Sequence, residues 1–123
     1  MGTYRLTVKC HFDAAHALRR YPGECRDLHG HTWDVEATVS GTNLDEIGIV
    51  YDFKQLKDDL TEVTDPLDHT YLNEVPPFDE MNATAENLAR YIYDSLVERV
   101  PPEVYVHEVA VWESPEARIT YSK

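Results

Sequence analysis

Cysteine is scarce in this sequence, because Cys10 and Cys25 are the only two among 123 residues. A small secreted domain that depends on disulfides carries several pairs of cysteines, whereas a chain of this length buries a core without cross-links. The hydrophobic content of 42% is typical of a globular protein. We therefore expect a single domain over residues 1–123, working in a reducing cytoplasm.

Long apolar runs are also missing. The first ten residues alternate polar and apolar side chains, and an alternating segment is suited neither to a signal peptide nor to a membrane span. We expect a soluble protein without a targeting segment and without a membrane partner.

Basic residues are few, at 11 against 23 acidic residues, and the formal net charge is −12. Binding of nucleic acid through the general surface needs clustered Lys and Arg, so we expect no nucleic-acid partner. The charge is unevenly spread: residues 1–31 carry five basic and three acidic side chains, and the remainder carries six basic and twenty acidic ones. A small phosphorylated substrate would be tolerated best in that first segment, although a solvated surface of mixed charge explains the same arginines.

The hydrophobic pattern predicts four strands and two helices in the order strand, strand, helix, helix, strand, strand. This order is an α+β fold, with a four-stranded antiparallel sheet that has both helices on one face. The sheet's other face is then uncovered and not purely polar, which favours an oligomer. The predicted strands are residues 4–12, 32–40, 103–112 and 117–121; Asp52 and Thr84 cap the helices, which end near Thr64 and before Pro101.

Three histidines and a cysteine lie close together in the sequence: His16, Cys25, His29 and His31. Residues two apart in a strand project to the same side, so His29 and His31 can offer two imidazoles to one metal ion, and His16 can supply the third. Three imidazoles leave tetrahedral Zn²⁺ one open position, as catalytic zinc sites do. The cluster therefore predicts a zinc site.

The role of Cys25 is open from the residues alone. It is a buried small hydrophobe, the fourth ligand of a closed structural site, or a proton acceptor. Its charged neighbours Glu24, Arg26 and Asp27 are unlike a core segment, and structural zinc sites usually contain more cysteine. A thiol beside zinc and an arginine would have a pKa lowered toward neutrality, which suits a base.

Two further sets of residues are candidates for proton transfer and for ligand binding. Asp68 and His69 pair a carboxylate with an imidazole in a predicted loop, although such a pair is also common in turns. Glu113 directly follows a predicted strand. Its carboxylate could accept hydrogen bonds from an amino-pyrimidine edge, or it is a turn residue. His11 and His107 fit strand patterns and are expected to be structural or surface residues.

Together these residues resemble the family of 6-pyruvoyltetrahydropterin and 6-carboxytetrahydropterin synthases. The shared motifs follow the family's order along nearly the whole chain. They are Phe12-Asp13-Ala14-Ala15-His16, Cys25 separated by three residues from His29-Gly30-His31, Asp68-His69, Thr84-Ala85-Glu86-Asn87 and Trp112-Glu113.

The resemblance implies the tunnelling fold, in which subunits join into an oligomeric barrel and usually form a homohexamer of two trimers with active sites between subunits. It also implies a role for each motif. Zinc would bind His16, His29 and His31; Cys25 would be the general base; Asp68 and His69 would be the second proton-transfer pair; Glu113 would anchor the pterin ring; Thr84 and Glu86 would lie near the pterin pocket.

The substrate implied by the resemblance is 7,8-dihydroneopterin triphosphate. The short spacing from Cys25 to His29 resembles that of the enzymes that release 6-carboxy-5,6,7,8-tetrahydropterin, acetaldehyde and triphosphate for 7-deazaguanine (queuosine) synthesis, and we predict this reaction. The 6-pyruvoyl product is an alternative. Glu24 indicates another, because some relatives use a glutamate in this loop and release 6-hydroxymethyl-dihydropterin for folate synthesis.

Two hypotheses of other classes remain. The chain would be a non-catalytic oligomeric domain if Cys25 and the three histidines closed a structural zinc site. It would be a zinc hydrolase if a metal-bound hydroxide were the nucleophile, and simple esters or phosphates would then be cleaved without Cys25.

Overall fold

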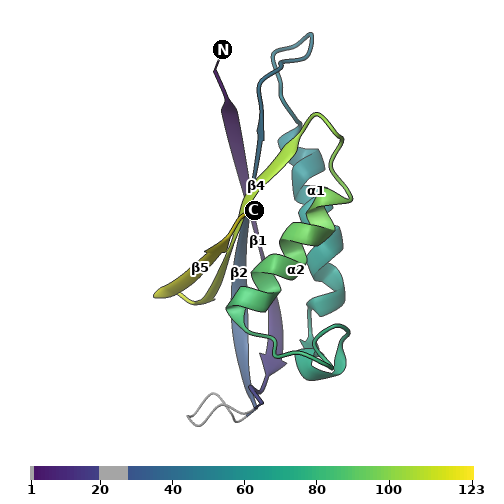
Figure 1. Cartoon of the computed structure of the whole chain (residues 1–123). Helices are drawn as coiled ribbons and strands as arrows, with labels where there is room; N and C mark the ends of the chain where they lie inside the picture. The colour runs from purple at the N-terminus through teal and green to yellow at the C-terminus, as the bar shows by residue number, and fades with distance from the viewer. Residues whose placement is uncertain (1, 20–27) are drawn as a thin grey trace.

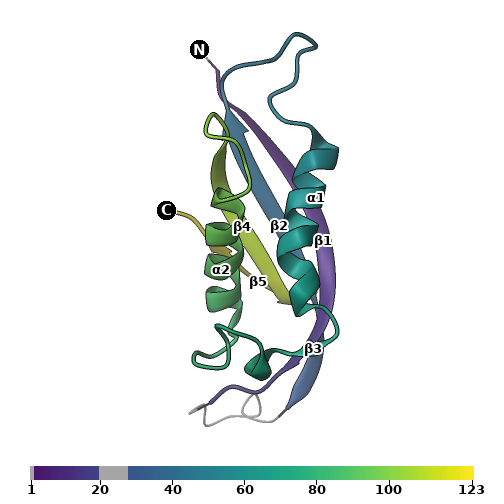
Figure 2. The same cartoon turned by 90° about the vertical axis from the view of Figure 1, so that its right-hand side faces the viewer.

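The computed structural model describes residues 2–19 and 28–123. Its main elements form a sheet with two helices packed on one face (Figures 1 and 2). In chain order they are β1 (Tyr4–His16), β2 (His29–Gly41), α1 (Phe53–Thr64), the 3-10 turn η2 (Asp65–Leu67), β3 (Thr70–Tyr71), the 3-10 turn η3 (Leu72–Glu74), α2 (Ala85–Val97), β4 (Tyr105–Ser114) and β5 (Ala117–Tyr121).

The sheet has five strands in the order β3-β1-β2-β4-β5. The predicted α+β class and the two helices on one face are confirmed, but the sheet is not a four-stranded antiparallel one. β3 joins it by pairing in parallel with Ala14 and Ala15 of β1, while all other pairs are antiparallel. A strand of two residues is too short to show a period of two, which is why the sequence pattern missed it.

The first two strands pair over 13 residues each, from Tyr4 opposite Gly41 to His16 opposite His29. They are longer than the predicted 4–12 and 32–40. The alternation of large apolar residues stops near Phe12, but main-chain pairing continues past it and carries both strands to the histidines. The length of this ribbon therefore decides where His16 and His29 meet.

One face of the sheet packs on the helices. Trp33, Val35, Ala37 and Val39, which are alternate residues of β2, are fully buried. Burying a large apolar side chain contributes about 1.5–3 kcal/mol, so this layer is the main stabilising feature of the fold. The helix residues that cover it are Leu56, Leu60, Leu88, Ile92 and Leu96.

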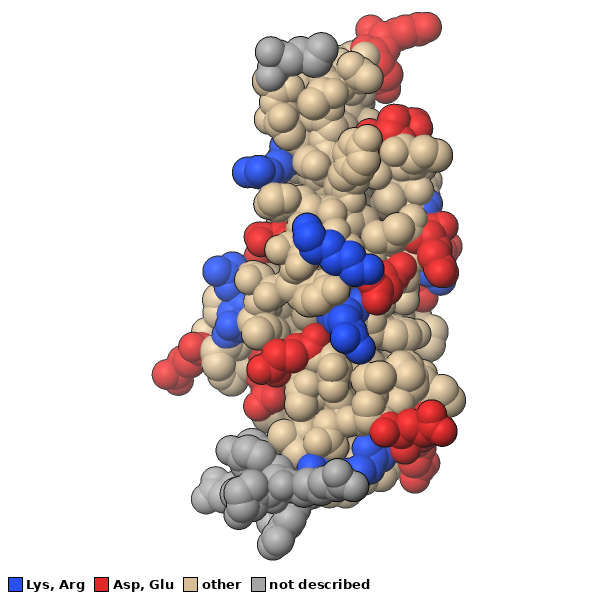
Figure 3. All heavy atoms as spheres, in the orientation of Figure 1, with Lys and Arg blue, Asp and Glu red and all other residues tan. Residues whose placement is uncertain are grey.

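The opposite face is polar where β1 and β2 cross its centre. The hydroxyl groups of Thr7 and Thr38 are 2.7 Å apart, and Lys9 Nζ is 3.7 Å from Glu36 Oε1. In the view of Figure 3, where the sheet lies nearly edge-on, basic and acidic side chains are interspersed over the visible surface. This face is able to meet water without an apolar cover, so an oligomeric barrel is not required by the sheet and stays a prediction.

Both predicted helix caps are confirmed. The side chain of Asp52 accepts a hydrogen bond from the main chain of Lys54, and that of Thr84 accepts one from Asn87. Gln55, three residues after the cap Asp52, donates to Asp59 at 3.0 Å. No helix in the described part of the chain is long and apolar enough to cross a membrane.

Candidate metal centre

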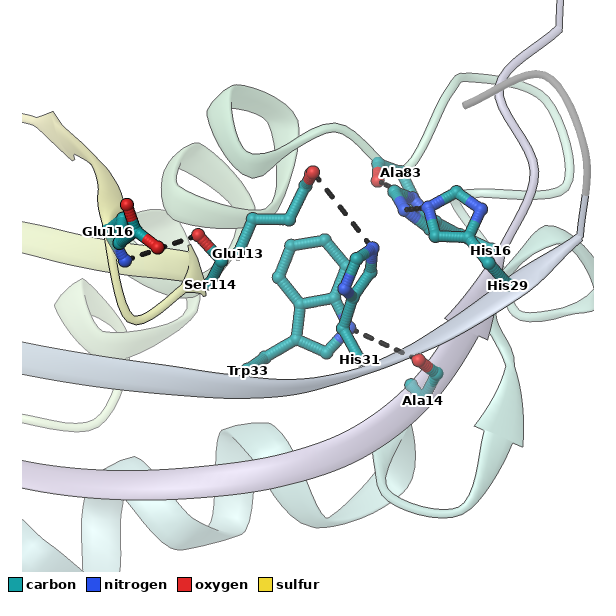
Figure 4. A network of polar contacts seen from close by, with 9 residues as sticks. All are labelled: Ala14, His16, His29, His31, Trp33, Ala83, Glu113, Ser114 and Glu116. Atoms are coloured by element: carbon teal, nitrogen blue, oxygen red, sulfur yellow. Dashed lines mark hydrogen bonds and ion pairs between the residues drawn. The ribbon is translucent and has the colours of Figure 1, made fainter. Parts of the chain in front are cut away.

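Three histidines meet at one end of the β1–β2 ribbon. His16 and His29 are register partners, and His31 follows two residues later on the same side of β2. The Nε2 atoms of His16 and His29 are 3.0 Å apart, and the ligand atoms of all three rings lie within 4.8 Å of one another. Figure 4 shows His16 and His29 close together, with His31 beside them. The strand pairing thus gathers the three predicted ligands.

The donor set fits a metal ion. A buried side-chain nitrogen normally has a hydrogen-bond partner, yet His31 Nε2 is buried and has none among the described residues. Zn–N bonds of about 2.0–2.1 Å in a tetrahedral site place the nitrogens about 3.3 Å apart. The nitrogens of His16 and His29, 3.0 Å apart, are near that spacing, and the third lies within 4.8 Å, so a bound ion would give the orphaned nitrogen of His31 a partner.

The surroundings keep two of the imidazoles neutral and orient one of them. Burial lowers the pKa of both His16 and His31, and a neutral ring is the form that binds a metal. His16 Nδ1 is 2.8 Å from the carbonyl oxygen of Ala83. A donated proton there leaves Nε2 with its lone pair toward the cluster. A metal-binding histidine usually donates its other ring N–H to a carbonyl or carboxylate in this way.

Trp33 forms the wall behind the cluster. Its side chain is fully buried, and its ring centroid lies 5.0 Å from that of His16 and 5.3 Å from that of His31. The indole Nε1 donates to the carbonyl oxygen of Ala14 at 3.3 Å. Because its own hydrogen bond is made elsewhere, the indole offers the histidines an apolar surface that limits their rotation.

Glu113 approaches the cluster from β4. Its Oε1 lies 3.9 Å from His31 Nε2, which is too long for a hydrogen bond, and its side chain is 32% exposed. The turn after it is held by a hydrogen bond from the main chain of Glu116 to Ser114 (Figure 4). A partly exposed carboxylate at the rim of a histidine cluster is available to a ligand that reaches the metal.

Asp68 and His69 form a second group, beside Asp13 on β1. The two side chains lie 3.0 Å apart, from His69 Nδ1 to Asp68 Oδ2. The Asp13 main chain donates to Asp68 Oδ1 at 2.9 Å and accepts from the His69 amide at 2.6 Å. The first of these bonds is the largest cause that lowers the pKa of Asp68. His69 has a φ of 57°, a left-handed conformation that is uncommon outside glycine and is often found at functional sites.

In the structure, this second group and the cluster of three histidines lie on opposite faces of the β1–β2 ribbon. Asp13 and Ala15 alternate along β1 with the buried Ala14 and His16, so they belong to the face away from the helices. A hollow of about 450 Å³ is lined by Asp13, Ala15 and His69, with Gly30, His31, Thr32, Ala14 and Thr70. His69, which is paired with Asp68, therefore lines an open hollow, while the three ligand nitrogens cluster on the helix side of the ribbon.

The structure describes the positions of only some of the other predicted site residues. Cys25 and Glu24 lie outside the described residues. Thr84 has its hydroxyl engaged as the cap of α2, and Glu86 is exposed in the first turn of that helix. Their placement near a pterin pocket stays a prediction.

Sequence reasoning missed two groups that shape these clusters. The carbonyl of Ala83 and the main chain of Asp13 act through backbone atoms, which carry no residue-type signal. The only signal that could have found them is position: Ala83 precedes the predicted cap Thr84, and Asp13 lies three residues before His16.

Comparisons with known proteins agree with this geometry. The family model described as 6-pyruvoyl tetrahydropterin synthase matches residues 5–123. The chain is 36% identical over 114 residues to a dihydroneopterin monophosphate aldolase of Pyrococcus furiosus, covering 91% of each chain. It is 37% identical over 103 residues to a 6-carboxy-5,6,7,8-tetrahydropterin synthase of Synechocystis, covering 80% of this chain and 78% of that one. The 6-pyruvoyl tetrahydropterin synthase of Caenorhabditis elegans superposes with a TM-score of 0.88 at 26% identity, covering 100% of this chain and 97% of that one.

Proposed function

The chain belongs to the 6-pyruvoyl tetrahydropterin synthase family, and we propose that it is a zinc-dependent 6-carboxy-5,6,7,8-tetrahydropterin synthase. Over residues 1–123, as one domain, it converts 7,8-dihydroneopterin triphosphate to the carboxypterin, acetaldehyde and triphosphate in 7-deazaguanine synthesis in the cytoplasm. The observation that carries the proposal is the cluster of three imidazoles, with ligand atoms within 4.8 Å and one buried nitrogen that lacks a hydrogen-bond partner.

His16, His29 and His31 hold the zinc ion in this proposal. When bound, the ion acts as a Lewis acid toward the hydroxyl groups of the substrate's side chain, which makes the adjacent carbon-bound protons more acidic. The chain's own part is to keep the rings of His16 and His31 neutral by burial and to fix His16 through Ala83.

Proton transfer falls to two groups. Cys25 removes a proton from the substrate side chain as a thiolate. His69 donates or accepts the second proton, because its Nδ1 faces Asp68 and a carboxylate in that position stabilises the charged imidazole. Glu113 accepts hydrogen bonds from the amino-pyrimidine edge of the pterin, and Thr84 and Glu86 support the pocket around it.

We further propose that the active site is completed between subunits of a homohexamer. Two features support this. Asp13, which holds the Asp68–His69 pair, belongs to the sheet face opposite His16. Within the described part of the chain, β3 pairs only with Ala14 and Ala15, so most of the outer edge of β1 is open for pairing with another copy.

A second activity is favoured by one specific observation. The similarity to a dihydroneopterin monophosphate aldolase extends over 91% of each chain. Glu24, next to Cys25, is also a residue type that, by the family resemblance, some relatives use in this loop when they release 6-hydroxymethyl-dihydropterin. The competing proposal is therefore an aldolase that acts on the monophosphate.

Product identification separates the two. Zinc-loaded protein is incubated with 7,8-dihydroneopterin triphosphate and, in parallel, with the monophosphate, and the products are identified by mass. The synthase gives the carboxypterin and acetaldehyde from the triphosphate, and the aldolase gives the hydroxymethylpterin from the monophosphate. A 6-pyruvoyl product would place the chain with the biopterin enzymes, and no turnover of either substrate would refute the proposal.

The variant Cys25→Ala tests the rival roles of the thiol. We expect it to keep zinc and the fold but to lose turnover. A closed structural site predicts the reverse, with loss of metal and unfolding, and a zinc hydrolase predicts that esters or phosphates are still cleaved.

A further inference from the structure

Two asparagine side chains hold the segment that follows β1. Asn73 accepts from the Ala17 amide at 3.1 Å and donates to the Ala17 carbonyl at 2.8 Å. Asn82 does the same for Arg19, at 2.9 and 3.0 Å. Each side-chain amide thus satisfies both main-chain groups of one residue, as a neighbouring strand would. The segment 17–19 is thus joined to the loop 73–83 by paired hydrogen bonds of the kind that join two strands.

The side chain of Arg19 fastens the same loop from within. Its Nη1 donates to the carbonyls of Phe78 and Met81 at 3.2 Å each. Its Nη2 donates to the carbonyls of Asn73, Phe78 and Asp79 at 3.2–3.4 Å. A planar guanidinium with five N–H groups can serve several oxygens at once, which a lysine ammonium cannot do in one fixed geometry. The loop therefore curves around one cation whose hydrogen bonds, among the residues that the structure describes, all go to main-chain oxygens.

The loop that these contacts hold, residues 73–83, ends at the candidate metal centre. Ala83, the residue after Asn82, is buried, and its carbonyl lies 2.8 Å from His16 Nδ1. The Asn87 side chain also donates to the Asn82 carbonyl at 2.9 Å, which ties Asn82 to α2. The residue before Ala83 is thus held through its side chain by Arg19 and through its carbonyl by α2, which limits where the Ala83 carbonyl can lie.

We propose that Arg19, Asn73 and Asn82 are positioning residues for the metal centre, because they hold the Ala83 carbonyl against His16 and so fix the tautomer that binds the metal. This inference rests on the proposed zinc site. None of the three touches the ligand nitrogens. Changing an outer-shell partner of a metal-binding histidine typically weakens metal binding about 10- to 100-fold.

Zinc affinity provides the first test. The dissociation constant is measured by competition with a chromogenic chelator for the native protein and for Arg19→Gln and Asn82→Ala, under conditions where circular dichroism shows all of them folded. We expect both variants to bind zinc about 10- to 100-fold more weakly. The matched control is Arg99→Gln, since Arg99 donates to the Ser95 carbonyl and pairs with Glu62 at a site formed by the two helices. Its affinity should equal that of the native protein.

The tautomer of His16 provides a second test that needs no metal. In metal-free protein at a pH where imidazole is neutral, two-bond ¹⁵N–¹H correlation spectra distinguish a proton on Nδ1 from one on Nε2. We expect Nδ1–H in the native protein and in Arg99→Gln, and a mixture in Arg19→Gln and Asn82→Ala. A purely structural role would lower the melting temperature of these variants and leave the tautomer unchanged.

The outcomes separate this inference from the function. If the native protein binds zinc no better than His31→Ala, the zinc site is refuted, and the tautomer spectra alone decide whether the three residues position His16. If zinc binds and both variants retain native affinity and the Nδ1–H tautomer, the zinc site stands and the positioning role is overturned. Should one variant fail to fold, the other gives the same reading.

Discussion

Replacing His31 by leucine should stabilise the metal-free protein. Its Nε2 atom is buried and has no hydrogen-bond partner among the described residues, and the side chain is only 22% exposed. A buried polar atom left unsatisfied costs about 1–3 kcal/mol. Leucine removes that atom, keeps apolar volume against Trp33 and suits a strand. We expect the free energy of unfolding to rise by about 1 kcal/mol when a chelator is present.

Zinc should make the native protein more stable than His31→Leu, the reverse of the order expected in chelator. A ligand that binds only the folded state adds about 2.7 kcal/mol at a concentration 100 times its dissociation constant. The native protein gains this amount, and His31→Leu gains little of it because one of three imidazoles is gone. The variant is therefore the more stable form in chelator and the less stable form in zinc.

Urea unfolding followed by circular dichroism, with chelator and with zinc, measures both effects. The control is His11→Leu, because His11 is an exposed residue of the same ribbon outside the cluster. Its stability should change by no more than about 0.5 kcal/mol in either condition. The reasoning is refuted if His31→Leu is less stable than the native protein in chelator, or if zinc stabilises both equally.

Three further predictions concern groups outside the cluster. Burial raises the pKa of the Cys10 thiol, so iodoacetamide at pH 8 should modify Cys25 faster than Cys10 by peptide mass mapping, and equal rates would contradict a base at Cys25. Buried Asp59 accepts from Tyr51 and Gln55, so Asp59→Ala should cost about 2–3 kcal/mol in urea unfolding, against little for the exposed Asp58→Ala. Since the net charge is −12, the melting temperature should rise between about 0.1 and 1 M NaCl, as the Debye length falls from about 10 to 3 Å; a constant value would refute self-repulsion.

The sequence predicted the helices and strands that are long enough to show a repeating pattern of apolar residues. Both helices, their caps Asp52 and Thr84, and the antiparallel pairing of the first two strands follow from apolar spacing and local capping chemistry. β3 could not be predicted, because the pairing of Thr70 and Tyr71 with β1 depends on tertiary contacts between segments more than fifty residues apart. The strand ends were missed for a similar reason, since main-chain pairing continues where apolar alternation stops.

At the candidate site, the side chains that form the cluster could be predicted from the sequence, but the main-chain atoms that orient them could not. Three histidines at strand spacing already indicated a shared ligand, and the structure gathers them. The carbonyl of Ala83, which orients His16, and the cation that holds its loop, Arg19, have no such signature. A carbonyl is present in every residue, and only the folded path of the chain decides which one reaches an imidazole.

The pairing of β1 with β2 makes metal binding sensitive to strand register. His16 lies opposite His29, and His31 lies on the same side two residues later. A slip of one residue in β2 would turn His29 and His31 to the other face and leave His16 alone, and it would also expose Trp33 and the apolar residues in line with it. The hydrophobic layer that selects the fold therefore selects the geometry of the three imidazoles as well. Because the unfolded chain has no such site, any zinc bound here contributes its binding free energy to that same register.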